Sequence, residues 1–302
     1  MEQRYAKILN DDAFKVVILA PGNERLLTKI IQLLLPDIRI AGLRFDDKEQ
    51  HGLVVSDKNA TFDLLCTTED DSQFIVELQS RSNESYPDRM LAYSTFPIRT
   101  QLATKMDALR NGIAADRMDY SLLPVYVVSL INFKLQHDRD DALDGDGLVS
   151  RYSIRNDRNS ELMTDALHFV YLEMGRLRAG KDEAWKCRTL LERFAWSVKY
   201  MHEVEEMPEG YEDDLLRMLY NASELANMPI KKRKDYDDII MNELDQLIRM
   251  NMARDEGHAE GREEGREEEK LGIAKKLLAM GLPLDQVAEA TGLPIERLSE
   301  LL

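Results

Sequence analysis

Two carboxylates and an amide interrupt two predicted strands at positions where apolar residues are usual. Asp63 lies in the segment 60–68, which is rich in Phe, Leu, Thr and Cys. Glu77 and Gln79 lie in the segment 73–80, which carries a dense apolar set. Side chains alternate between the two faces of a strand, so Glu77 and Gln79 point away from the more apolar side of theirs. If the two strands pair as a hairpin, Asp63 and Glu77 can lie close together on one sheet face.

Paired carboxylates of this kind suit a divalent cation. A second carboxylate nearby raises the free-energy cost of ionising the first unless the two share a cation. Mg²⁺ and Mn²⁺ accept a few hard oxygen ligands, with waters completing the shell. Such an ion polarises a phosphodiester and activates water for attack on it. A second interpretation is an edge sheet with one solvated face, on which Asp63, Glu77 and Gln79 are plain surface residues.

The segment after the second strand predicts a helix that carries a cation to the same region. Tyr86, Arg89 and Tyr93 recur at i, i+3 and i+7, so they share one helix face. Arginine is permanently charged, and its planar guanidinium fits phosphate oxygens. Arg89 could therefore offset negative charge during cleavage, with Tyr93 as a support. Alternatively, Arg89 covers the surface of an amphipathic helix or only neutralises Asp63 or Glu77.

The order of the sequence motifs around these residues resembles that of a known protein family. The order FD, then IVELQ, then DRMLAYS is similar to that of the PD-(D/E)XK nuclease family transposases, which include the recombination-promoting nucleases. The resemblance covers roughly the first two-thirds of the chain, and the tail also resembles the family. It implies that Asp63 and Glu77 bind a metal and that Gln79, which stands where the superfamily usually has Lys, orients the attacking water or the scissile phosphate.

The predicted site must work without the usual lysine, and it has one further candidate acidic ligand. Glutamine supplies no positive charge and takes no proton, so we expect the metal to activate water and Arg89 to stabilise charge. Glu24 lies in the first turn of a helix predicted over 24–35. In some members of the superfamily an acidic residue of this helix joins the metal site, which makes Glu24 a candidate third ligand. Otherwise a first-turn Glu only complements the helix dipole.

The charge balance argues against a simple nucleic-acid binder. The formal net charge is −16, with 56 acidic and 40 basic residues, whereas affinity for phosphates needs clustered Lys and Arg. Much of the acid lies in the tracts 203–214 and 256–269, so a basic groove could persist around four residues, Arg81, Arg89, Arg99 and Lys105. No apolar run is long enough to span a membrane, and the start lacks a signal-peptide core, so we expect a cytoplasmic protein. Two distant cysteines predict no disulfide framework.

The order of predicted elements indicates an α/β (α+β) fold. Further strands are predicted over 124–133, 149–154 and 167–172, which with the first two make a mixed sheet flanked by helices. The family resemblance implies a restriction-endonuclease-like core. We predict four parts, namely a nuclease-like domain at 1–182, a helical extension at 183–252, a charged Gly/Glu-rich linker at 253–270, and a small helix-turn-helix-like module at 271–302.

The C-terminal parts favour association over base reading. Gly257, Gly261 and Gly265 recur in a highly charged tract, which predicts a frayed helix or a flexible hinge. The sequence LDQVAEATGLPIERL resembles the core of a helix-turn-helix unit, but its third helix carries Glu296 and Glu300 where a base reader needs basic or amide side chains. We therefore expect a protein–protein module, with a homo-oligomer through the C-terminal helices as its simplest use.

Together these features predict a metal-dependent DNA endonuclease with a role in recombination or transposition-like events. Its cofactor would be Mg²⁺, with Mn²⁺ as an alternative, and its partner would be DNA. The alternative is a catalytically weak or inactive nuclease-like scaffold that binds nucleic acid or protein partners through its C-terminal helices. A helix-turn-helix regulator is the third hypothesis, but it leaves most of the chain without a purpose.

Overall fold

The computed structural model describes residues 3–45, 63–69, 71–82, 84–111, 120–136, 143–144 and 147–301. The chain divides into two compact units, residues 1–239 and residues 240–302. The start of the first predicted site strand, residues 60–62, lies outside the described residues. The division falls inside one long helix, so the four parts expected from the sequence stay a prediction.

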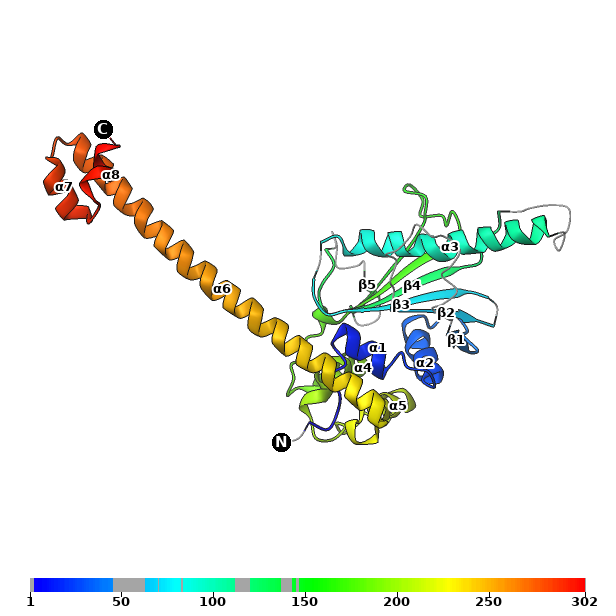
Figure 1. The fold of residues 1–302 in the computed structure, drawn as a ribbon. Coiled ribbons are helices and arrows are strands. Elements are labelled where there is room, and N and C mark those ends of the chain that lie inside the picture. Colours follow the sequence, from blue (N-terminus) through cyan, green and yellow to red (C-terminus); the bar gives the residue numbers. More distant parts are fainter. Residues whose placement is uncertain are drawn as a thin grey trace. The chain divides into compact units, whose positions relative to one another are not determined.

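The first unit is built on a seven-stranded sheet with the order β1-β2-β3-β4-β7-β6-β5 (Figure 1). The strands β3, β4 and β7 run parallel, and the other neighbours pair antiparallel. This confirms the predicted mixed sheet. The strand bounds are β1 Leu43–Phe45, β2 Leu64–Thr68, β3 Gln73–Gln79, β4 Val125–Ile131, β5 Leu143–Asp144, β6 Val149–Ser153 and β7 Leu167–Glu173.

The apolar pattern of each strand matches its place in the sheet. All seven residues of β4 are buried, as expected of a continuous β-branched run at the centre of a sheet covered on both faces. The strand β3 beside it has five buried residues between two half-buried ends. The two strands that carry the candidate site residues are therefore held in place by the core of the unit.

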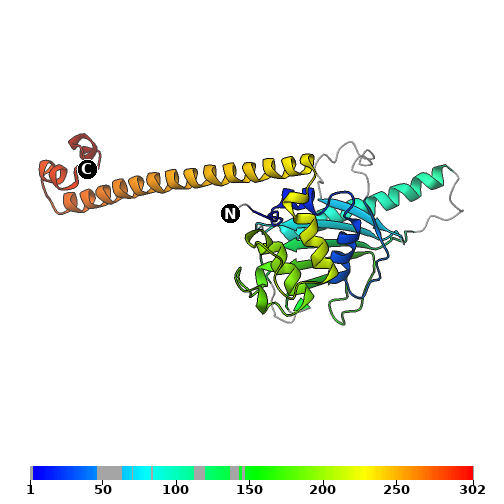
Figure 2. The ribbon, with the colours of Figure 1, turned by 90° about the horizontal axis from the view of Figure 1, so that it is seen from below.

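Helices cover both faces of this sheet (Figures 1 and 2). On one face lies α3, Tyr86–Arg110, whose residues Tyr86 and Met90 pack with Ile75, Val127 and Tyr171 of the sheet. On the other face lie four helices, α1 Asp11–Val17, α2 Glu24–Leu34, α4 Leu190–Tyr200 and α5 Asp214–Ser223.

The long helix α3 differs from its sequence prediction at one point. Pro97 predicted a kink or a break, because proline removes one backbone hydrogen bond. The helix continues through Pro97 to Arg110 without a break, and Pro97 itself is buried. Packing of the buried face of α3 offsets the missing hydrogen bond.

The second unit contains most of α6, Ile230–Ala279, followed by α7, Leu284–Thr291, and α8, Ile295–Ser299. Gly281 and Gly292 adopt positive φ angles of 84° and 68°, as residues that end helices often do. A small core holds the three helices together and consists of Ala274, Val287, Leu293 and Leu298. The helices predicted for the C-terminal module are thus present.

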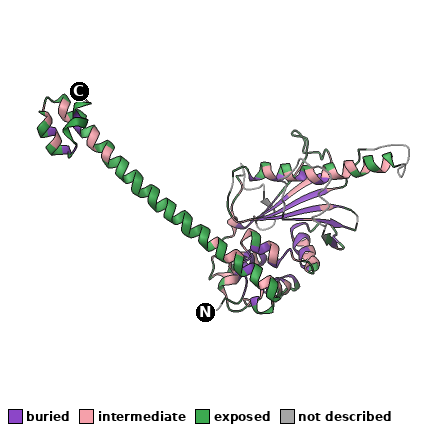
Figure 3. Cartoon of the chain, viewed as in Figure 1, coloured by how far each residue is buried: buried purple, intermediate pink, exposed green. Residues whose placement is uncertain are grey.

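The tract 253–270 is helical throughout, as part of α6. The sequence predicted a frayed helix or a hinge here, because each helical Gly costs about 1 kcal/mol relative to Ala. The surrounding Glu, Arg, Lys and Ala are strong helix formers, which offsets that cost. Residues 251–266 are all exposed (Figure 3). Within the described parts of the chain, no helix combines the length and apolar character needed to cross a membrane.

Candidate functional site

The β2–β3 hairpin brings the two predicted acidic residues together. Leu64 pairs with Val76 in the antiparallel register, which places Asp63 at the end of β2 beside Glu77. The backbone N–H of Asp63 donates to Glu77 Oε1 over 3.2 Å. Only 6% of Asp63 and 4% of Glu77 is exposed, so neither is a solvated surface residue.

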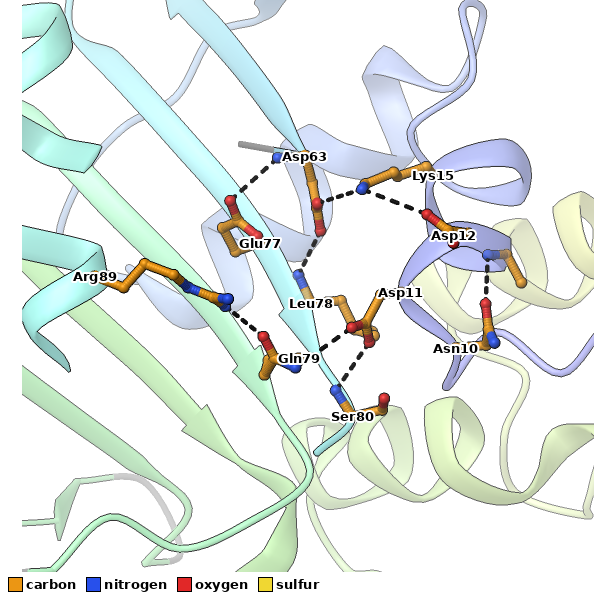
Figure 4. A network of polar contacts seen from close by, with 11 residues as sticks. Asn10, Asp11, Asp12, Lys15, Asp63, Glu77, Leu78, Gln79, Ser80 and Arg89 are labelled. Carbon is orange, nitrogen blue, oxygen red and sulfur yellow. Dashed lines mark hydrogen bonds and ion pairs between the residues drawn. The ribbon is translucent and has the colours of Figure 1, made fainter. Parts of the chain in front are cut away.

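Among the described residues, the carboxylate of Asp63 has two partners (Figure 4). Its Oδ2 accepts from the backbone N–H of Leu78 over 3.0 Å. Its Oδ1 lies 2.9 Å from Nζ of Lys15, a residue of α1. Burial raises the pKa of Asp63, and the contacts with Leu78 and Lys15 oppose that shift. Burial lowers the pKa of Lys15, but the hydrogen bond with Asp63 and the nearby carboxylates outweigh it and raise the pKa overall.

The surroundings of Glu77 favour its protonated, uncharged form. Burial, and then the charge of Asp63, raise the pKa of Glu77 from 4.5 to about 8. Arg89 and Lys15 lower it only in part. Without a further cation, Glu77 is therefore largely protonated at neutral pH. A group with this environment gains from a shared cation, as expected for a member of a metal-binding pair.

Gln79 connects the helix α3 to the helix α1 across the end of β3 (Figure 4). Its Oε1 accepts a hydrogen bond from Arg89. Its Nε2 lies 3.4 Å from Asp11 Oδ2, and the other carboxylate oxygen of Asp11 accepts from the backbone N–H of Ser80 over 2.9 Å. Because a guanidinium only donates and a carboxylate only accepts, these partners fix which way the Gln79 amide points.

Arg89 lies between two aromatic rings of its own helix. Its guanidinium carbon is 4.9 Å from the ring centre of Tyr86 and 5.8 Å from that of Tyr93. This confirms that the three residues share a helix face. Among the described residues, the hydrogen-bond partner of Arg89 is Gln79 rather than Asp63 or Glu77. The geometry therefore favours a contact of Arg89 with Gln79 over a simple ion pair with the carboxylates.

Three buried polar atoms beside Glu77 lack a well-formed hydrogen bond. They are Tyr86 Oη, Ser129 Oγ and Arg89 Nε, considered within the described part of the chain. Ser129 is the direct neighbour of Glu77 in the parallel β3–β4 register. Burial raises the pKa of Tyr86, and the Ser129 hydroxyl beside it opposes that shift, although the two do not reach good hydrogen-bond geometry. This side of Glu77 thus presents two hydroxyl groups and one guanidinium N–H without a hydrogen-bond partner among the described residues.

Comparison with known protein families shows which family the chain belongs to. The sequence model of the PD-(D/E)XK nuclease family transposases matches residues 8–253. The chain belongs to this family. The match includes the hairpin, α1 and α3, so it confirms the resemblance first seen in the sequence. No curated protein and no solved structure matches the chain.

Membership in the PD-(D/E)XK family indicates a nuclease- or transposase-related role and implies DNA as the substrate. Its nucleases generally use divalent metals. The described residues contain no group of three or more His, Cys, Asp and Glu side chains arranged around one metal. Two carboxylates nevertheless fit Mg²⁺, because this ion keeps several of its waters. The elevated pKa of Glu77 favours that fit.

Glu24, the candidate third ligand, makes a local contact. Its carboxylate accepts from the backbone N–H of Gly22 over 3.0 Å at the start of α2. In the described structure no contact connects it with Asp63 or Glu77. Its part in the metal site stays a prediction.

The sequence analysis did not single out Lys15 or Asp11. Both come from α1, DDAFKVV, whose buried residues Ala13, Phe14 and Val17 attach it to the unit. Four-residue spacing puts Asp11 and Lys15 on one side of this helix. The available signal was a charged residue at the edge of an apolar run.

The raised pKa of Glu77 predicts how stability depends on pH without metal. An acid whose pKa is higher in the folded state binds more protons there, so the free energy of unfolding falls as pH rises from about 4.5 to about 8. We expect a loss on the order of a few kcal/mol across this window. Urea unfolding in EDTA would measure it. A Glu77→Gln variant should show a flatter profile, and an equally steep profile in the variant would contradict the assignment.

Proposed function

We propose that this PD-(D/E)XK family member is a metal-dependent DNA endonuclease that hydrolyses phosphodiester bonds in recombination or transposition-related events. The observation that carries the proposal is the buried contact between Asp63 and Glu77. A pair of buried carboxylates with an elevated pKa costs stability, and a shared divalent cation is the simplest reason to keep it. The site lies in the part of the chain matched by the nuclease family.

In this proposal Asp63 and Glu77 hold Mg²⁺, with Mn²⁺ as an alternative. A bound ion of this kind polarises the phosphodiester and lowers the pKa of an attacking water. Gln79 orients that water or the scissile phosphate, because its amide is fixed between Arg89 and Asp11. Glutamine itself neither donates positive charge nor takes a proton.

Two cations of this chain take the place of the missing lysine. Arg89 binds phosphate oxygens through its remaining N–H groups, of which Nε is without a partner among the described residues. The rings of Tyr86 and Tyr93 fix its plane. Lys15 approaches from the α1 side, where its ammonium group lies against Asp63. In this proposal both charges stabilise the negative charge that builds up during attack on a phosphate.

A catalytically weak or inactive scaffold is the second candidate. Its support is the Lys15–Asp63 ion pair, which neutralises Asp63 without any metal. In that case nucleic acid or protein partners would bind through the C-terminal helices. A homo-oligomer formed by those helices is part of both proposals.

Incubation of the purified full-length chain with supercoiled plasmid tests the proposed function. We expect nicked and then linear DNA with Mg²⁺ or Mn²⁺, and intact plasmid in EDTA. Failure of a folded protein to cut with Mg²⁺, Mn²⁺ or Ca²⁺ would reject the endonuclease in favour of the scaffold.

A further inference from the structure

A cleft of about 750 Å³ opens on the α3 side of the sheet, next to the candidate site. This volume lies in the range of about 300–1,000 Å³ that is usual for small-ligand pockets. Three parts of the chain line it, namely the loop before α3 with the first turns of that helix, the segment after β4, and the strands β6 and β7. The lining residues that matter below are Glu84, Asp88, Phe133, Tyr152, Phe169 and Tyr171.

The wall after β4 is fixed in place by the end of β7. Buried Glu173 accepts from the backbone N–H of Leu135 over 2.9 Å, and Arg176 donates to the carbonyl of Leu135 over 2.8 Å. Gly175 allows the two segments to approach closely, since a Cβ there would lie 2.6 Å from the carbonyl carbon of Phe133. The contacts of Glu173 therefore hold this wall in position.

The floor of the cleft is a set of flat aromatic rings. Phe169 and Tyr171 are nearly parallel, with ring centres 6.5 Å apart and an angle of 3°. Tyr152 of β6 meets Tyr171 edge to face at 5.9 Å. Tyr152 is 42% exposed, so part of its ring faces solvent. Aromatic floors of this kind favour a planar ligand that can stack.

The cleft is close to the proposed cutting site. Glu77 pairs in register with Ser129, and Ser129 pairs with Tyr171. Two strand spacings of about 4.8 Å therefore separate Glu77 from Tyr171, about 10 Å in all. Asp88, which lines the cleft, directly precedes Arg89 in α3. A nucleotide chain held at the carboxylates could thus reach the cleft with a neighbouring base.

The cleft carries charges of both signs, because Glu84 and Asp88 are exposed carboxylates and Lys134 is an exposed cation. The carboxylates repel phosphate, whereas Lys134 attracts it. The same carboxylates accept hydrogen bonds from the amine groups of nucleobases. The sugar–phosphate chain would then run toward Arg89 and Lys15, with one base turned into the cleft.

We propose that this cleft binds an unpaired nucleobase of the strand that is cut, by stacking on Tyr152 and the neighbouring rings. The inference rests on the proposed function and narrows its substrate to single-stranded or locally opened DNA. A base inside an intact duplex is stacked on both sides and cannot enter such a cleft.

The test uses a single-stranded oligonucleotide that carries one 2-aminopurine, whose fluorescence falls when it stacks on an aromatic ring. Full-length protein is titrated in EDTA, so that cleavage does not interfere, and affinity is followed by anisotropy of a terminal dye. The variants are Tyr152→Ala and Tyr152→Phe. The control is Tyr120→Ala, because Tyr120 is 78% exposed and does not line the cleft.

We expect quenching with the wild type, with Tyr152→Phe and with the control. Tyr152→Ala should lose the quenching and about 5- to 150-fold in affinity, as for the loss of one base–aromatic stack. Unchanged quenching and affinity in Tyr152→Ala, or no binding of the oligonucleotide by the wild type, would overturn the proposal. Quenching by a protein that, with Mg²⁺, cuts neither plasmid nor the single-stranded oligonucleotide would support the cleft and reject the endonuclease, whereas metal-dependent cutting without quenching would do the reverse.

Discussion

Replacement of Glu77 by Gln is expected to abolish cleavage and to stabilise the metal-free protein. The variant keeps the size of the side chain and an oxygen that can accept from the Asp63 N–H, but it loses the charge that a cation needs. We expect single-turnover incision to fall by at least about 10²- to 10³-fold, the usual scale for loss of an electrostatic group at a reacting centre. Removal of a buried carboxylate with an elevated pKa should raise the free energy of unfolding in EDTA at pH 8.

The two effects together distinguish a catalytic role from a structural one. Replacement of a structural residue lowers the free energy of unfolding. Replacement of an active-site residue can raise it, because such residues often reduce stability in return for function. Glu209→Gln is the matched control. Glu209 is exposed, and its replacement makes the same chemical change away from the site. Plasmid incision gives the rate, and urea unfolding gives the stability. Full activity in Glu77→Gln would contradict the assignment of Glu77 as a metal ligand.

Replacement of Lys15 by Met is expected to reduce cleavage by about 10²-fold, because a preorganised cation near the scissile phosphate contributes on that scale. Its ammonium group lies 2.9 Å from Asp63 Oδ1 and is the cation of α1 that reaches the candidate site. Lys29→Met is a closely matched control. The Lys29 side chain is 36% exposed against 37% for Lys15, and it pairs with Asp214 on α5 instead.

Single-turnover rates of Lys15→Met and Arg89→Met, measured across a range of DNA concentrations, separate binding from chemistry. A lower maximal rate in both variants would show that two cations share the role of the missing lysine. An effect on DNA affinity alone would assign the residue to binding. Wild-type rate and affinity in Lys15→Met would leave the ion pair with Asp63 as a purely structural contact and favour the scaffold.

The part of the site that depends on local pattern could be predicted from the sequence. Alternation along two strands placed Asp63 and Glu77 side by side, and helical spacing placed Arg89 between Tyr86 and Tyr93. In the structure the backbone N–H of Asp63 donates to Glu77, and the guanidinium of Arg89 lies near both rings. These features involve residues close in sequence, so periodicity is enough to locate them.

The part that depends on distant segments could not be predicted. Lys15 reaches Asp63 only because α1 packs on the end of β3, and no short-range pattern reports such a contact. The fixed orientation of Gln79 likewise needs partners from α1 and α3 together. In the tract 253–270 the prediction gave the glycines more weight than the helix-forming residues around them, and the structure shows a helix.

The central claim is that Asp63 and Glu77 carry out metal-dependent DNA cleavage. The most direct measurement compares the wild type with Asp63→Asn in plasmid incision, with Mg²⁺ and with EDTA. Asparagine keeps an oxygen for the Leu78 N–H, and a melting curve confirms that the variant is folded. The account predicts incision by the wild type only with Mg²⁺ and none by Asp63→Asn. Equal incision by the folded variant, or incision by the wild type in EDTA, would contradict it.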